Sequence, residues 1–156
     1  MLVASYLWRP TAPGLHGSNR EASVAIDKCI TEYGASEVIF EEGTIGRELF
    51  VVLDGTVEIV RDAPNQRIVI ATLGKGEFFG EMAVIDSSPR SATAIAAAPN
   101  TRVISINHAR FVYLVAQQPA FALMIMDALS NRLRATNAAN LARALGVPPD
   151  QMAANR

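Results

Sequence analysis

The feature that most constrains the fold is a series of short apolar runs in the middle of the chain. Each run is rich in Val, Ile and Phe, and each is bounded by Gly, Asp, Asn or Pro. Strands separated by turn residues at this spacing are typical of an antiparallel sandwich or barrel. Asp54–Gly55 lies between two apolar runs and predicts a two-residue hairpin. The expected strand regions are residues 36–43, 48–62, 66–79 and 101–107.

Helical patterns flank this central region. Residues 20–33 place apolar side chains on one face of a helix, and Gly34 follows as the expected end of that helix. The pattern returns to helix over residues 108–118. Pro119 can occupy the first turn of a further, long helix, and Gly146 is the expected end of that helix. The expected order is therefore one helix, a β core and then two helices.

Composition argues against several classes of function. Charged residues make up 19% of the chain and the net charge is −1, without the basic character of most nucleic-acid-binding domains. Cys29 is the only cysteine, so no disulfide can form within the chain and a reducing cytoplasm is expected. Cys29, His16 and His108 are too few and too scattered for a metal site. No apolar stretch reaches the roughly 20 residues of a membrane span, and the N-terminus lacks the pattern of a signal peptide.

A Gly-Glu pair and an arginine stand in the segment that interrupts the strands. Gly80 and Glu81 lead into a short helical turn over residues 82–85, whose first backbone N–H groups can bind an anion. Arg90 can donate to two oxygens of one phosphate, and Ser91 adds a hydroxyl. Glu81 only accepts hydrogen bonds, which suits a sugar hydroxyl. This combination describes a nucleotide site, and the alternative is a structural ion pair between Glu81 and Arg90.

From Phe79 the sequence reads Phe-Gly-Glu-Met-Ala-Val-Ile, and from Pro89 it reads Pro-Arg-Ser-Ala-Thr. This segment resembles the phosphate-binding cassette of the cyclic-nucleotide-binding domain family. Gly43, Gly46 and Gly55 match the turns of that family's β-roll. The resemblance covers most of the chain. It implies an α+β, mainly β fold, namely an antiparallel, jelly-roll-like β-roll with an N-terminal helix and two C-terminal helices.

The resemblance also implies a role for each residue of the cassette. Arg90 would bind the exocyclic phosphate, and Glu81 would accept a hydrogen bond from the ribose 2′-hydroxyl. Backbone N–H groups would line the sugar-phosphate, and the last helix would cover the base. The expected ligand-binding residues are Phe79, Gly80, Glu81, Met82, Ala83, Arg90, Ser91, Ala92, Thr136 and Asn137.

The ligand that the resemblance implies is a cyclic purine mononucleotide. In the kinase branch of the family, alanine after the arginine goes with cAMP and threonine goes with cGMP. Ser91 instead resembles the catabolite activator branch, whose serine contacts the phosphate of cAMP, so cAMP is favoured over cGMP. Thr136 and Asn137 match the positions that meet the base, but both can bond to either purine. No catalytic residue is expected.

The last helix is the expected output element. A spacing close to a coiled-coil seam is followed by Leu129, Leu133, Thr136, Asn140, Ala144 and Val147. Catabolite activators dimerise through the corresponding helix. The alternative is that the same stripe packs on the protein's own β-roll. Those activators continue into a helix-turn-helix, whereas this chain ends at Arg156. Signalling through an unidentified effector protein, without direct DNA binding, is therefore expected.

The expected organisation is a flexible arm over residues 1–19, a nucleotide-binding domain over 20–146 and a tail over 147–156. The leading hypothesis is a non-enzymatic, cytoplasmic sensor that captures the nucleotide and signals through its C-terminal helix. One alternative is a ligand-free interaction domain with a structural cassette. Another is a fragment of a larger regulator, channel or transcription factor. Hydrolysis of the cyclic phosphate is disfavoured, because the sequence offers neither a metal cluster nor a general base.

Overall fold

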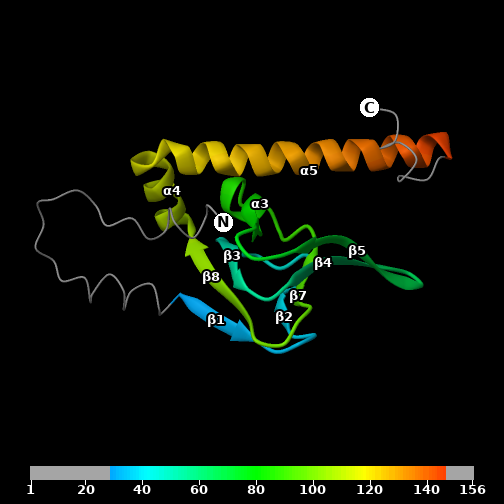
Figure 1. Cartoon of the computed structure of the whole chain (residues 1–156), viewed down its shortest axis with the longest axis horizontal. Helices are drawn as coiled ribbons and strands as arrows, with labels where there is room; N and C mark the ends of the chain where they lie inside the picture. The colour runs from blue at the N-terminus through cyan, green and yellow to red at the C-terminus, as the bar shows by residue number, and fades with distance from the viewer. Residues whose placement is uncertain (1–28, 147–156) are drawn as a thin grey trace, which may run out of the picture. The chain divides into compact units, whose positions relative to one another are not determined.

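The computed structural model describes residues 29–146, and Figure 1 labels most of its elements. The chain divides into two compact units, with the boundary between Tyr113 and Leu114. In chain order the elements are β1 (Ile30–Tyr33), β2 (Val38–Phe40), β3 (Glu48–Asp54), β4 (Val57–Ala63), β5 (Gln66–Leu73), β6 (Phe78–Phe79), α3 (Glu81–Ile85), β7 (Thr93–Ala96), β8 (Thr101–Asn107), α4 (His108–Gln117) and α5 (Pro119–Leu145).

The first unit is built from two antiparallel four-stranded sheets. One sheet has the strand order β1-β8-β3-β6, and the other has the order β2-β7-β4-β5. Their inner faces share one hydrophobic core, because apolar side chains from both sheets form a single buried cluster. That cluster consists of Phe50, Val52, Val57, Leu73, Phe79, Ala94 and Val103. The expected α+β class with an antiparallel β-roll is confirmed.

The helix expected over residues 20–33 is wrong at its C-terminal end. Residues 30–33 form β1, which pairs with β8 from Ile30↔Ile104 to Tyr33↔Thr101. Ile, Thr and Tyr favour strands, and pairing with β8 satisfies the backbone groups of this segment. Residues 20–28 lie outside the described residues, as do the expected arm and tail.

The hairpin expected at Asp54–Gly55 is also wrong, although the chain does turn there. β3 and β4 belong to different sheets, so this turn carries the chain from one sheet to the other. Gly55 has a φ of 82°, and a Cβ there would lie 2.7 Å from the Cα of Thr101. Thr101 is fully buried, and its hydroxyl donates to the carbonyl oxygen of Ala98 at 2.7 Å. The local sequence is typical of a hairpin, but Gly55 instead forms a turn between the two sheets and packs closely on Thr101.

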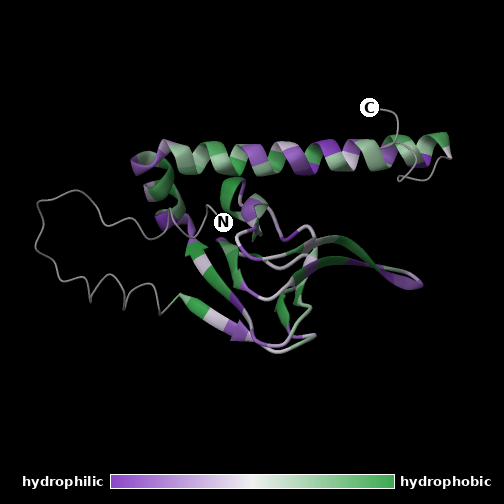
Figure 2. Ribbon diagram, viewed as in Figure 1, coloured by the Kyte–Doolittle hydropathy of each residue, from purple (hydrophilic) through white to green (hydrophobic). Residues whose placement is uncertain are grey.

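The paired hairpin of this region is β4–β5, in which Ala63 lies opposite Gln66. Figure 2 shows the tip of this hairpin as hydrophilic. The strand expected over residues 66–79 is divided into β5 and β6 by a turn in which Gly76 has a φ of 87°.

The two C-terminal helices are confirmed close to their expected bounds. The side chain of Asn107 accepts a hydrogen bond from the backbone N–H of Arg110 at 2.9 Å, as an N-cap does. Pro119 occupies the first turn of α5, and Gly146 caps its C-terminus in the left-handed conformation. Among the described helices, none is long and apolar enough to cross a membrane alone. The bent pair of α4 and α5 meets that test only when the two are taken together, on length and composition.

Candidate functional site

The candidate site begins where the chain leaves the core at the end of β6. Gly80 has φ 76° and ψ 12°, and this left-handed residue turns the backbone directly into α3. Among residues 29–146, no side chain caps the first turn of α3. Ala83 and Val84 are buried and hold the short helix against the β-roll. At its other end, Nδ1 of His108 donates to the carbonyl oxygen of Val84 at 3.0 Å.

The second half of the site is Arg90, which is held by both its backbone and its side chain. Its N–H donates to the carbonyl oxygen of Thr44 at 2.9 Å, and its own carbonyl oxygen accepts from the N–H of Gly43 at 2.8 Å. Nη1 of Arg90 donates to the carbonyl oxygen of Gly80 at 2.9 Å. The guanidinium carbon lies 4.2 Å from the centroid of the Phe40 ring. These contacts bring Arg90 to the start of α3 and keep its side chain only 5% exposed.

Two glycines leave the room that the guanidinium occupies. A Cβ on Gly46 would lie 2.5 Å from Nη2 of Arg90, and a Cβ on Gly80 would lie 2.6 Å from Nη1. Real Cβ atoms essentially never approach other atoms so closely. The arginine therefore fits in this place because neither neighbour carries a side chain.

The electrostatic setting of Arg90 favours an anionic ligand. Burial lowers the pKa of the Arg90 guanidinium, and the carboxylates of Glu48 and Glu81 offset part of that effect. The side chain stays charged, because the ordinary pKa of arginine is far above physiological pH. Among the described residues, Nε of Arg90 is buried without a hydrogen-bond partner. A buried charged group with an unused donor is costly unless an anion or water completes it.

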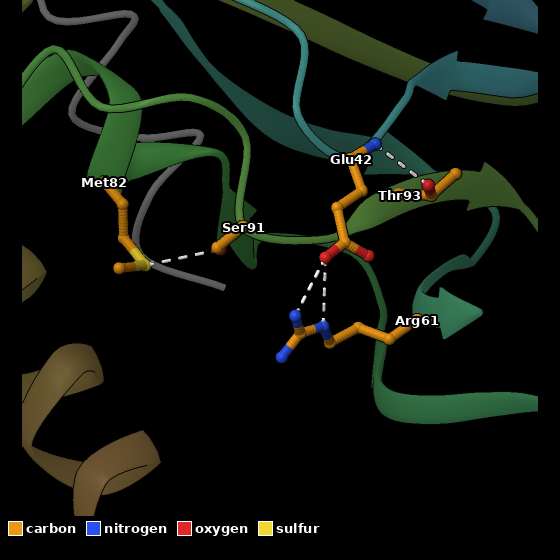
Figure 3. Close-up of polar contacts among 5 residues, drawn as sticks. All are labelled: Glu42, Arg61, Met82, Ser91 and Thr93. Carbon is orange, nitrogen blue, oxygen red and sulfur yellow. Dashed lines mark hydrogen bonds and ion pairs between the residues drawn. The ribbon is translucent and has the colours of Figure 1, made fainter. Parts of the chain in front are cut away.

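A contact between Ser91 and Met82 also joins the two halves of the site. The hydroxyl of Ser91 donates to the sulfur of Met82 over 3.5 Å, as Figure 3 shows. Met82 is 50% exposed. A thioether is a weak acceptor, so a phosphate oxygen can replace it as the partner of Ser91. Glu81, at the first position of α3, is only 7% exposed.

The two segments of the cassette, which are separated in the sequence, meet in the structure. Gly80–Ala83 and Arg90–Ala92 meet through the bond from Arg90 to Gly80. Phe79 and Ala92 are buried, at 1% and 6% exposure, so their side chains contribute to the core.

Thr136 and Asn137 lie on α5, in the second compact unit. The hydroxyl of Thr136 donates to the carbonyl oxygen of Arg132 at 2.9 Å, a bond within the helix. A role for these two residues in covering the base stays a prediction.

The sequence motif missed several residues of the site. Phe40 lies against the guanidinium of Arg90, and Glu48 contributes to its charge balance. Neither has a local signal, because each is far from the cassette in the sequence. Among the described residues, no group of three or more His, Cys, Asp or Glu side chains could hold a metal ion.

Comparison with known proteins gives one consistent result. The family model described as the cyclic nucleotide-binding domain matches residues 30–118, more than half of the chain. The chain is 33% identical to the cyclic AMP receptor protein of Thermus thermophilus over 103 residues, which are 65% of this chain and 47% of the receptor. The chain thus spans about half the length of the curated relatives it matches.

Solved structures agree with this match. The catabolite activator protein of Thermus thermophilus superposes with a TM-score of 0.65 at 29% identity, covering 85% of this chain and 60% of that one. The cAMP-bound form of the EAL enzyme Bd1971 superposes with a TM-score of 0.54 at 28% identity, covering 74% of this chain and 32% of that enzyme.

Proposed function

Since the chain belongs to the cyclic nucleotide-binding domain family, we propose that it is a sensor domain for a cyclic purine mononucleotide. It binds cAMP in preference to cGMP, performs no chemistry on the ligand and signals through its C-terminal helices. Relatives of this family include parts of enzymes, such as a cGMP-dependent protein kinase. In this proposal the domain itself only binds, and it works in the cytoplasm.

The observation that carries the proposal is the state of Arg90. Its guanidinium is 5% exposed, stays charged, and keeps a buried Nε without a hydrogen-bond partner among the described residues. A folded protein rarely leaves a buried charge incompletely paired, because the desolvation cost is large. The cyclic phosphate supplies the missing partner, since its oxygens accept from the planar guanidinium in a fork.

The other residues of the cassette complete the binding site. The backbone N–H groups of Gly80, Met82 and Ala83 bond to the sugar-phosphate, and Glu81 accepts from the ribose 2′-hydroxyl. Ser91 exchanges the sulfur of Met82, its partner at 3.5 Å, for a phosphate oxygen. This exchange is favourable because a phosphate oxygen is a far stronger acceptor than a thioether.

The preference for cAMP is supported by Ser91 and by the printed names of relatives. The Thermus thermophilus relative is a cyclic AMP receptor protein. The EAL enzyme Bd1971 has been solved with cAMP and also with cGMP, so a domain of this kind can accept both. Ser91 therefore supports a preference and not an exclusive choice.

Signalling is proposed to start at the bond between Arg90 and Gly80. When the phosphate draws the guanidinium toward itself, the backbone of Gly80 and the start of α3 respond. The far end of α3 is bonded to the first residue of α4 through His108 and Val84. From α4 the change passes to α5, which is proposed to carry it to an effector protein or to a second copy of the chain.

Isothermal titration calorimetry with cAMP and then cGMP tests this function. The wild type is expected to bind at micromolar concentration, equivalent to about −8 kcal/mol. Arg90→Ala is expected to weaken binding at least a hundredfold, because the phosphate loses its charged partner. Arg67→Ala is the matched control, since Arg67 is an exposed arginine of the same unit that pairs with Asp62.

Three outcomes can be separated. Binding that is lost in Arg90→Ala and kept in Arg67→Ala supports the sensor. Normal binding by a folded Arg90→Ala variant contradicts the cassette assignment. A folded wild type that ignores both nucleotides favours a ligand-free interaction domain, and the thermal unfolding of each variant shows whether it is folded.

A further inference from the structure

An oxidisable side chain stands at the start of α3. Met82 is the second residue of this helix, and its neighbours Glu81 and Ala83 are only 7% and 2% exposed. Met82 itself is half exposed, so its side chain lies outside the core. Oxidants reach such a methionine readily, because the reaction takes place at an accessible sulfur atom. Met82 therefore combines an accessible thioether with a place in the proposed binding site.

The sulfur of Met82 already has a polar partner in the cassette. Oγ of Ser91 lies 3.5 Å from Sδ of Met82, and Figure 3 shows the two side chains pointing toward one another. Ser91 directly follows Arg90, whose Nη1 donates to the carbonyl oxygen of Gly80 at 2.9 Å. The thioether thus lies beside the hydroxyl that is proposed to bind the phosphate. A chemical change at this sulfur acts on that hydroxyl directly.

Oxidation by a hydroperoxide converts the thioether into a sulfoxide. With hydrogen peroxide, a lone pair of the sulfur attacks one oxygen, the O–O bond breaks and an S–O bond forms. The transferred oxygen gives its proton to the other oxygen, which leaves as water. The sulfur is oxidised by two electrons and the peroxide is reduced by two. A thioether is a weak acceptor, whereas the sulfoxide is polar and its oxygen is a much better acceptor.

We propose that Met82 is a site of reversible oxidation, and that its sulfoxide lowers the affinity of the cassette for the cyclic nucleotide. This inference rests on the proposed function. In the reduced protein, a phosphate oxygen displaces the thioether from Ser91, because the phosphate is the stronger acceptor. In the oxidised protein, the sulfoxide oxygen holds the same hydroxyl, and its partial negative charge opposes the phosphate. Enzymatic reduction of the sulfoxide restores the original site.

The experiment treats the purified chain with hydrogen peroxide and measures cAMP affinity by calorimetry before and after. Peptide mass spectrometry reports the fraction of Met82 that has become sulfoxide. Met82→Leu is the test variant, since leucine is apolar and of similar size but has no sulfur. This variant keeps Cys29 and the other methionines, so oxidation elsewhere affects it as it affects the wild type.

Met126→Leu is the matched control. Met126 is 61% exposed, but it lies on α5, in the second compact unit. A third variant, Ser91→Ala, removes the hydroxyl for which sulfoxide and phosphate compete. Every comparison is the ratio of affinities after and before oxidation within one variant, so differences in basal binding cancel. Thermal unfolding before and after oxidation checks that each protein is folded.

The expected results follow from the competition for Ser91. The wild type and Met126→Leu are expected to lose cAMP affinity roughly tenfold on oxidation. Methionine sulfoxide reductase is expected to restore the affinity of the oxidised wild type. Met82→Leu is expected to keep its affinity on oxidation. Ser91→Ala is expected to lose less than the wild type, because its sulfoxide has no hydroxyl to hold.

Two failures can be told apart. If the wild type binds cAMP and its affinity is unchanged after Met82 is converted, the inference is wrong and the proposed function stands. The same holds if Met82→Leu or Ser91→Ala loses as much affinity as the wild type, or if Met82 stays reduced while Met126 is converted. If the folded, unoxidised wild type binds no cyclic nucleotide, the proposed function fails and the inference fails with it.

Discussion

Nη1 of Arg90 donates to the carbonyl oxygen of Gly80 at 2.9 Å, so the two ends of the cassette are joined by a direct hydrogen bond. Gly80 is also the residue whose left-handed backbone begins α3. A ligand that moves the guanidinium therefore acts on the backbone that begins this helix. His108 lies at the other end of α3, where it donates to Val84. One short helix thus connects the phosphate site with the start of α4.

Gly46→Ala is expected to impair binding with little effect on the fold. The new Cβ would lie 2.5 to 2.8 Å from three atoms of the Arg90 guanidinium. Because the guanidinium is the end of a flexible side chain, it can move, but it then leaves the position that a phosphate needs. We expect calorimetry to show at least a tenfold loss of cAMP affinity and unfolding to show a nearly unchanged Tm.

Gly34→Ala is the control for this substitution. A Cβ on Gly34 would meet its nearest neighbour at 3.6 Å, an ordinary contact. A Gly46→Ala variant that binds as tightly as Gly34→Ala would show that the position of Arg90 does not govern affinity.

His108→Ala is expected to separate binding from signalling. The substitution removes the bond from Nδ1 of His108 to Val84 but leaves the cassette residues in place. We expect cAMP affinity to stay within a few-fold of the wild type, while the change in hydrogen exchange of α5 on adding cAMP becomes smaller. Val112→Ala, at an exposed position of α4, is the control. An undiminished exchange response in His108→Ala would remove this bond from the proposed route.

Gly55→Ala is expected to destabilise the fold by about 2–4 kcal/mol. Its φ of 82° disfavours a side chain, and the new Cβ would also lie 2.7 Å from the Cα of Thr101. Gly43→Ala separates the two causes, because Gly43 has a φ of 79° but, in the part of the chain that the structure describes, no atom lies within 4 Å of a built Cβ. In the Gly43→Ala control, the free energy of unfolding is expected to fall only by the cost of placing a side chain at positive φ, about 1–2 kcal/mol. Equal free energies of unfolding in urea for the two variants would contradict the packing argument.

Tyr33 is expected to make the fold less stable at high pH. Burial raises the pKa of the Tyr33 phenol above its ordinary value, and the nearby carboxylates of Glu37 and Glu48 raise it further. Above pH 10 the unfolded chain loses this proton more readily than the folded chain does. The stabilisation is therefore complete below the ordinary pKa and is lost as the pH rises through the folded pKa.

The measurement compares Tyr33→Phe with the wild type over the alkaline range. We expect the free energy of unfolding of the wild type to fall more steeply above pH 10 than that of Tyr33→Phe. Tyr113→Phe, at an exposed position, is expected to follow the wild type. Parallel pH profiles for Tyr33→Phe and the wild type would contradict the assignment.

The amino-acid sequence was sufficient for features that depend on neighbouring residues. Gly80, Glu81 and Arg90 identify the cassette because they lie close together in the chain. The ends of α5 were predictable for the same reason, since Pro119 and Gly146 act on the backbone in their own turns. The alternation of short apolar runs was likewise enough to predict an antiparallel β fold.

Only the tertiary structure decided which distant segments meet. Residues 30–33 form a strand because β8, far along the chain, provides the pairing partner. Gly55 joins two sheets instead of a hairpin because β3 and β4 pair with other strands. Phe40 under Arg90 and the pair of Glu42 with Arg61 are equally non-local. Local spacing reports the conformation that a segment can adopt. Burial and hydrogen bonding across the whole fold determine which surfaces that segment covers.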